Sequence, residues 1–165
     1  MASDEPPGRP IPVARVEETA VSRVSTYLNF QGDTEEAFTF YASVFGTEFS
    51  VPLQRFSDMP SGPGAPELPE NERSKVLHVE LPILAGHVLM GTDMLESMGH
   101  QLRVGNNTTI NLEPDTREEA ERLYAALSDG ATDGTGLNPM PWGSLWGTCL
   151  DRFGVRWMFN VTLEG

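Results

Sequence analysis

The chain carries the same hairpin ending twice: Gly86-His87-Val88-Leu89-Met90 in its first half and Gly154-Val155-Arg156-Trp157-Met158 in its second. In each copy a glycine opens a turn and a run of strand-forming residues follows it, so each predicts the last strand of a hairpin. Repetition of such a unit indicates that the chain is built from two similar modules.

Other segments repeat in the same order. Tyr27-Leu28-Asn29-Phe30 resembles Thr109-Ile110-Asn111-Leu112, and a helical run containing Glu-Glu-Ala follows each. The two first strands lie further apart in the sequence than the two hairpin endings do, so the first copy holds extra residues. The segment 56–74, rich in Pro, Gly and Glu, is the place we expect for them. Asp33-Thr34 likewise matches Asp115-Thr116, and four matches in one order favour duplication over chance similarity.

Composition narrows the classes of partner. A chain of 165 residues with 39% hydrophobic content can bury one sizeable core. Its formal net charge of −13 opposes phosphate backbones and anionic lipid surfaces, and its basic residues are scattered. No run of about 18 apolar residues is present that would span a bilayer. We therefore expect neither nucleic acid nor a membrane as a partner.

The N-terminal segment 1–22 has several prolines and no apolar stretch typical of a secretory signal, so we expect a flexible leader. A short strand within 11–16 that docks on a partner subunit is the alternative. The single cysteine, Cys149, lies in an apolar strand and is predicted to be a buried thiol. Together these features suit a cytoplasmic location.

Each module is predicted to run strand, helix, strand, strand, strand. In the first helix Asp33 is expected to be the N-cap, with Glu36 in capping-box position, and Gly46 to end the helix. Helical spacing predicts that Ala37, Phe38, Tyr41, Val44 and Phe45 pack on the sheet. The predicted strands are 24–31, 47–54, 75–81 and 87–93, then 108–113, 131–136 (weak), 144–150 and 155–162, and the second helix is 116–128.

These residues resemble a known family. The strand Tyr27-Leu28-Asn29-Phe30, with Gly32-Asp33, Glu36-Ala37, Phe40-Tyr41 and Phe45-Gly46 after it, resembles the opening of PhnB-like proteins of the vicinal oxygen chelate superfamily, which includes glyoxalases, bleomycin-resistance proteins and extradiol dioxygenases. The stretch 151–157 is similar to the turn before the last strand in that superfamily.

The resemblance implies an α+β fold of two βαβββ modules that form a cupped mixed β-sheet with helices on the outside, commonly as a homodimer. The first module is expected at 23–94, with its insertion at 56–74, and the second at 107–165 after a linker, 95–106. Whether the two modules pair within one chain or between chains stays open, since the linker is long enough for both.

Strand alternation then predicts which side chains face the cavity of the cup, because successive residues of a strand point to opposite faces. The predicted ligand-binding residues are Tyr27, Asn29, Met90, Thr109, Asn111, Trp146, Arg156 and Met158. His78 and Glu80 lie two apart on one strand face and are the candidate catalytic pair, with His78 as general base and Glu80 orienting it. A histidine hydrogen-bonded in a polar cavity lining is the alternative for His78.

Arg156 and the apolar lining are also open to two interpretations. The planar fork of Arg156 suits an anionic ligand, or it pairs with Glu80 or Asp151. Met90, Met158 and Trp146 suit a small hydrophobic ligand, or they close the cavity as core.

The metal enzymes that the chain resembles place a His or Gln near the start of each module's first strand and a Glu on its last strand. The matching positions here are Ser25 or Thr26, Asn107 or Thr108, Met90 and Met158. Divalent metals in such sites need imidazole or carboxylate donors, and a thioether suits Cu(I) instead. We therefore expect no metal ligands and no cofactor. No glycine-rich loop follows a strand and opens a helix, so neither a dinucleotide nor a methyl donor is predicted.

Two hypotheses follow for function. The first is a metal-free homodimer whose cavity binds a small organic ligand. The second is an enzyme that uses the same cavity, either as a lyase or isomerase through His78 and Glu80, or with a metal held by unexpected ligands.

Overall fold

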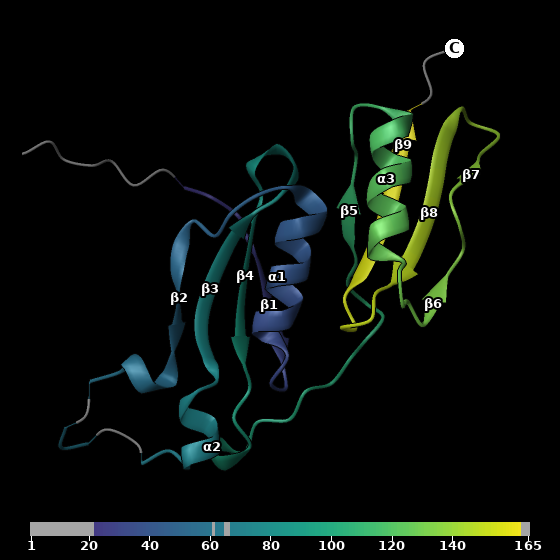
Figure 1. The fold of residues 1–165 in the computed structure, drawn as a ribbon. Coiled ribbons are helices and arrows are strands. Elements are labelled where there is room, and N and C mark those ends of the chain that lie inside the picture. Colours follow the sequence, from purple (N-terminus) through teal and green to yellow (C-terminus); the bar gives the residue numbers. More distant parts are fainter. Residues whose placement is uncertain (1–21, 61, 65–66, 163–165) are drawn as a thin grey trace, which may run out of the picture.

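The computed structural model describes residues 22–60, 62–64 and 67–162. The expected leader, apart from residue 22, lies outside the described residues. Two sheets lie side by side, with a helix of each on the same side of the molecule (Figure 1).

The first sheet has the strand order β1-β4-β3-β2. Strand β1 (Thr26–Phe30) leads into helix α1 (Thr34–Phe45), and β2 (Val51–Arg55), β3 (Val76–Pro82) and β4 (Val88–Asp93) follow. Of the neighbouring pairs described, only β1 and β4 are parallel, because α1 carries the chain back across the face of the sheet before β2 begins.

The second sheet repeats this order as β5-β9-β8-β6, with β7 also paired to β8. Strand β5 (Ile110–Leu112) leads into α3 (Arg117–Leu127), and β6 (Asp133–Gly134), β7 (Asn138–Pro139), β8 (Ser144–Leu150) and β9 (Arg156–Thr162) follow. Again the first and last strands, β5 and β9, form the one parallel pair among the neighbouring strands described. The predicted α+β fold of two βαβββ modules with outer helices is confirmed.

Several elements differ in detail from the sequence prediction. The insertion, expected to be a loop, contains the short helix α2 (Glu70–Arg73), and β7 was not expected. Strand β5 is shorter than the predicted 108–113. In β3 the fully buried Val79 and Leu81 alternate as expected, but the next buried residue is Val76 (1% exposed) and not Leu77, because the register between β2 and β3 shifts there.

The N-terminus of α1 is capped by a residue that the sequence did not indicate. Asp33 precedes the helix but its side chain makes no capping hydrogen bond, so the predicted capping box is wrong. The buried carboxylate of Asp93, at the end of β4, accepts hydrogen bonds from the Gly32 and Thr34 amides, at 3.0 and 3.1 Å, and from the Thr34 hydroxyl at 2.6 Å. A contact with a residue distant in the sequence thus satisfies the N–H groups at the start of α1 that a neighbouring capping side chain would otherwise satisfy. Gly46 ends α1 in the left-handed conformation, as predicted.

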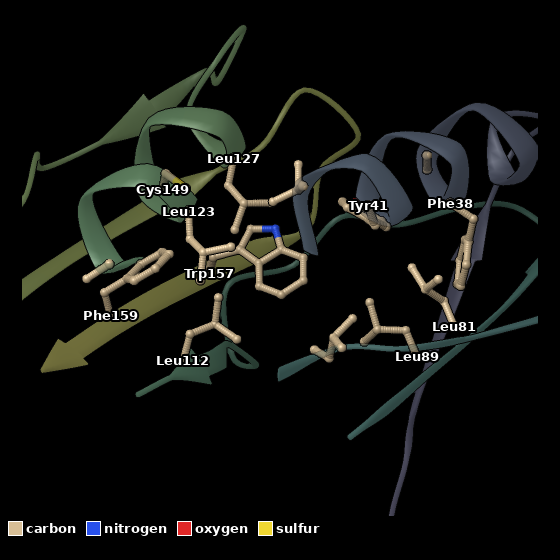
Figure 2. Close-up of a cluster of buried hydrophobic side chains, with 14 of the residues drawn as sticks. Phe38, Tyr41, Leu81, Leu89, Leu112, Leu123, Leu127, Cys149, Trp157 and Phe159 are labelled. Atoms are coloured by element: carbon tan, nitrogen blue, oxygen red, sulfur yellow. The ribbon is translucent and has the colours of Figure 1, made fainter. Parts of the chain in front are cut away.

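One hydrophobic core runs beneath both helices (Figure 2). Trp157 of β9 is fully buried, and its ring lies 5.5 Å from the Tyr41 ring and 5.8 Å from the Phe45 ring, both on α1. The first helix therefore packs on side chains of both sheets, as its predicted apolar face allows.

A buried carboxylate reinforces this junction. Asp151, in the turn between β8 and β9, accepts hydrogen bonds from the Tyr41 hydroxyl at 2.7 Å and from Trp157 Nε1 at 2.8 Å. It also accepts from the Phe153 and Val155 amides, both at 2.9 Å. Burial, and then the charge of Asp151, raise the pKa of Tyr41 well above its ordinary value, so the phenol stays a donor. The turn is thereby tied to the helix of the other module.

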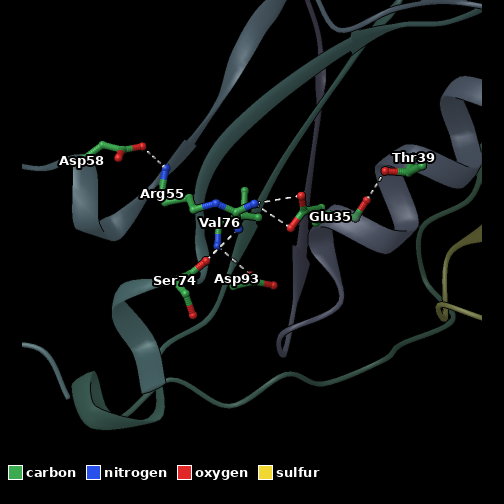
Figure 3. Close-up of polar contacts among 7 residues, drawn as sticks. All are labelled: Glu35, Thr39, Arg55, Asp58, Ser74, Val76 and Asp93. Carbon is green, nitrogen blue, oxygen red and sulfur yellow. Dashed lines mark hydrogen bonds and ion pairs between the residues drawn. The ribbon is translucent and has the colours of Figure 1, made fainter. Parts of the chain in front are cut away.

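The two ends of the insertion are anchored by Arg55 (Figure 3). Its guanidinium donates to the Glu35 carboxylate at 2.8 and 2.9 Å and to the Ser74 carbonyl at 2.8 Å. Its amide donates to the Asp58 carboxylate at 2.7 Å. Next to Ser74, the Val76 amide donates to Asp93 at 2.8 Å. The insertion thus leaves and rejoins the sheet at a fixed point beside α1.

No helix among the described residues is long and apolar enough to cross a membrane.

Candidate functional site

The first sheet presents polar side chains on the face that α1 does not cover, which we call the open face. Burial alternates along β4, where Leu89 is fully buried and Met90 is partly exposed. The register places Met90 directly between Tyr27 of β1 and Glu80 of β3. The predicted residues Tyr27, Asn29, His78, Glu80 and Met90 therefore come from three neighbouring strands of one sheet.

His78 and Glu80 form a contact pair on this face. His78 Nε2 lies 3.2 Å from Glu80 Oε1. The Arg23 guanidinium donates to both oxygens of Glu80, at 3.3 and 3.2 Å. The hydrogen bond with His78 and the contact with Arg23 lower the pKa of Glu80 against the opposing effect of burial. The carboxylate is therefore ionised near neutral pH.

The imidazole is also held from the side. The Tyr27 ring stacks on the His78 ring at 6.1 Å, with an angle of 29° between the planes. The side chain of His78 is 27% exposed, and Tyr27 is 49% exposed. An accessible imidazole oriented by a carboxylate is the arrangement that general acid or base chemistry requires.

The second sheet repeats the positions but not the chemistry. Met158 lies between Asn111 and Thr148 in the register, as Met90 lies between Tyr27 and Glu80. Trp146 pairs with Asn160. The predicted residue Thr109 precedes β5 and is exposed. At the positions of Glu80 and His78 this sheet thus has the hydroxyl of Thr148 and the indole of Trp146.

A pocket of about 320 Å³ lies between the two modules, and we call it the seam pocket. It brings together three predicted residues: Tyr27 and Asn29 from β1 and Arg156 from β9. The rest of its described lining is Thr26, Leu28, Leu102 to Gly105, Asn107, Thr108, Ile110 and Phe153 to Val155. The described lining does not include His78, Glu80, Met90, Trp146 or Met158. Asn111 lines a separate pocket of about 390 Å³.

The residues at the positions of the superfamily's metal ligands do not fit a divalent metal. On the first sheet the Ser25 hydroxyl lies 3.7 Å from the Met90 sulfur, and Met158 holds the matching place on the second. A hydroxyl and thioethers are poor donors for Zn²⁺, Mn²⁺ or Fe²⁺. Within residues 22–60, 62–64 and 67–162, no three His, Cys, Asp or Glu side chains are placed to share a metal ion.

Cys149 is fully buried on β8, and burial raises the pKa of its thiol to about 11. A protonated, buried thiol is a poor nucleophile. The prediction of a buried thiol is confirmed.

Two arginines at these surfaces were not among the predicted site residues. Arg23 lies two residues before Ser25, so strand alternation already places it on the face of Tyr27 and Asn29. Arg103 lines the seam pocket from the linker. The linker has no regular periodicity, so the sequence held no signal for Arg103.

Comparisons with known proteins agree with this architecture. The model of the family described as 3-demethylubiquinone-9 3-methyltransferase matches residues 22–160. Protein YjdN of Escherichia coli (strain K12) is 24% identical over 146 residues, which cover 86% of this chain and 96% of YjdN.

Among solved structures, protein PA1353 from Pseudomonas aeruginosa is 30% identical, with a TM-score of 0.73 and coverage of 87% of this chain and 100% of PA1353. A Bacillus cereus protein, named a putative 3-demethylubiquinone-9 3-methyltransferase and PhnB protein, is 25% identical, with a TM-score of 0.66 and coverage of 86% of this chain and 100% of that chain. Glyoxalase/bleomycin resistance/dioxygenase proteins that are 14 and 17% identical share the fold. The chain thus belongs to the family of PhnB-like proteins in the vicinal oxygen chelate superfamily, the family whose model is described as 3-demethylubiquinone-9 3-methyltransferase.

Proposed function

We propose that this protein binds a small organic molecule without a metal, as a cytoplasmic homodimer, through the open faces and the seam pocket. The observation that carries the proposal is the seam pocket, because apolar side chains and a few convergent polar groups meet there, as in most small-molecule sites. The partly exposed Met90 and Met158 extend an adaptable apolar lining over the sheets.

Poor metal donors at the superfamily's ligand positions support the metal-free part of the proposal. Elemental analysis of protein purified without added metal or chelator tests it. We expect substoichiometric Zn, Fe, Mn and Ni. One equivalent of any of these metals per chain would contradict the proposal.

Exposed apolar residues near β1 support a homodimer. Val24 is 85% exposed, Val104 56% and Tyr27 49%. Strand β1 is also an edge strand of its sheet. Clustered apolar surface of this kind is typical of an interface.

Light scattering coupled to size exclusion tests the dimer. We expect twice the mass of a single chain for the wild type, and a shift toward the mass of one chain for Val24→Glu, which lies outside the described lining of the seam pocket. Met59→Glu is the matched control, since Met59 is 40% exposed in the insertion. A wild-type protein with the mass of a single chain would contradict the proposed homodimer.

The contact between His78 and Glu80 favours a second candidate, an acid/base enzyme such as a lyase or isomerase that uses the same surface. For any substrate found by screening, we expect His78→Ala and Glu80→Gln to lower kcat by about 10²-fold or more. His100→Ala, in the exposed linker, is the control. Full activity in His78→Ala would remove this candidate. Methyl transfer is not the proposed reaction, since the sequence has no glycine-rich loop that would hold a methyl donor.

A further inference from the structure

The seam pocket has the opposite charge to the chain as a whole. The protein has 24 acidic and 11 basic side chains, a net charge of −13. The described lining of the seam pocket nevertheless contains two arginines, Arg103 and Arg156, and neither Asp nor Glu. A cationic pocket in an acidic protein concentrates anions locally, because close charges are screened less than distant ones.

The charge of Arg156 is only weakly compensated within the described chain. Its side chain is 21% exposed, and its Nη1 lies 3.4 Å from a carboxylate oxygen of Asp133, whose side chain is 64% exposed. Its Nε is buried and has no hydrogen-bond partner among the described residues. A guanidinium has five N–H donors in a planar fork that matches an oxyanion. Asp133 engages Nη1 and the buried Nε is out of reach, so Nη2 and the second N–H of Nη1 are the donors left for a ligand.

The other residues of the seam pocket suit the uncharged part of an organic anion. Amide groups of Asn29 and Asn107 are further hydrogen-bonding groups in the lining, and Leu28, Ile110 and Phe153 supply apolar surface. A volume of about 320 Å³ fits a ligand the size of one substituted ring.

From these contacts we propose that the seam pocket binds a small organic anion, with its carboxylate or phosphate group on Arg156 and Arg103 and an apolar body against Leu28 and Ile110. This inference rests on the proposed small-molecule function and names the class of ligand. Arg156 makes the principal contact because it is the less exposed of the two arginines and projects from a strand.

The test compares three probes that share a ring and differ in charge: benzoate, phenyl phosphate and neutral benzamide. Titrations followed by amide chemical shifts of ¹⁵N-labelled protein give both affinity and location. We expect the better anion to bind at least 10-fold more tightly than benzamide, with shifts at Tyr27, Asn29 and Arg156. Comparing benzoate with phenyl phosphate shows which oxyanion the pocket prefers.

Substitutions then show which arginine binds the charged group of the ligand. Arg156→Met should weaken anion binding at least 10-fold and Arg103→Met less, while benzamide binding changes by less than 2-fold in both. Arg117→Met, on the exposed face of α3, is the matched control for net charge and should bind as the wild type does. Asp133→Asn removes the competing carboxylate from an exposed position and should tighten anion binding. It also keeps the test decisive if Arg156→Met unfolds.

The outcomes separate this inference from the function on which it rests. Equal binding of benzamide and the anions in the seam pocket, with no effect of Asp133→Asn, would overturn the anion inference and leave the small-molecule function standing. Absence of shifts around Tyr27 with all three probes, up to about 10 mM, would overturn both.

Discussion

Asp151 joins the two modules through buried hydrogen bonds. Its carboxylate receives the Tyr41 hydroxyl and the Trp157 indole N–H in a buried setting, and these groups come from α1 and β9. Hydrogen bonds to a charged acceptor stabilise more than neutral ones. Removal of one of these donors should therefore lower the free energy of unfolding by a measurable amount.

We predict that Tyr41→Phe lowers the free energy of unfolding by about 1.5 to 3 kcal/mol, because it deletes a buried hydrogen bond to a carboxylate. Urea denaturation measures the change. Tyr27→Phe is the matched control, since Tyr27 is half exposed, and should leave the midpoint nearly unchanged. Equal effects of the two substitutions would contradict the importance of the Asp151 contact.

Glu80 leads to a prediction about pH. Its pKa lies below the ordinary 4.5 through His78 and Arg23, so the carboxylate stabilises the fold above its unfolded-state pKa. That contribution is lost as pH falls through the lower, folded-state pKa. We expect Glu80→Gln to be less stable than the wild type at pH 6, and the difference to shrink below pH 4.5. Urea midpoints at the two pH values measure it. Glu121→Gln, an exposed control, should show little pH-dependent difference.

At the scale of elements, β8 has a position where backbone passes close to backbone. A Cβ added to Gly147 would lie 2.3 Å from the carbonyl oxygen of Gly136. The chain before β7 therefore has to move if Gly147 gains a side chain, and close approach of this kind is a common reason for glycine within a strand.

We predict that Gly147→Ala destabilises the protein by about 1 to 3 kcal/mol through this clash. Gly62→Ala is the control, because a Cβ there meets nothing within 4 Å and its φ is not in the left-handed range. Thermal unfolding compares the two. A Gly147→Ala midpoint equal to that of the control would contradict the prediction, because it would mean that the segment around Gly136 moves without loss of stability.

The elements also show which features of the fold can be predicted from the sequence. Periodicity predicted the buried face of α1, since Phe38 and Tyr41 are fully buried. Gly46 marked the end of α1 correctly, because its left-handed conformation is a local preference. The predicted capping by Asp33 failed because Asp93, 59 residues after Thr34, supplies the oxygen. The alternation that placed Tyr27, His78, Glu80 and Met90 on one face of the first sheet is likewise a local property.

For the whole molecule, the shared core implies that the two modules unfold together. All three tryptophans, Trp142, Trp146 and Trp157, lie in the second half of the chain. Their fluorescence thus reports on the second module and, through Trp157, on its junction with α1, whereas far-UV circular dichroism reports on both modules.

We predict one urea transition with coincident midpoints for the two signals. Leu81→Ala, in the core of the first module, should lower stability by about 2 to 5 kcal/mol and shift the tryptophan transition equally. A tryptophan transition that stays at the wild-type midpoint would mean that the modules unfold independently.

The sequence by itself determined the repeat, the order of elements and the faces of the strands, because periodicity, turns and glycine positions are local. Only the tertiary structure decided the Asp93 cap, the contact of Asp151 with Tyr41 and the place of Arg103 in the seam pocket. The physical reason is separation along the chain: Tyr41 and Asp151 are 110 residues apart, and the seam pocket joins β1 to a linker without periodicity. Such contacts exist only after the modules pack, so no local sequence pattern predicts them.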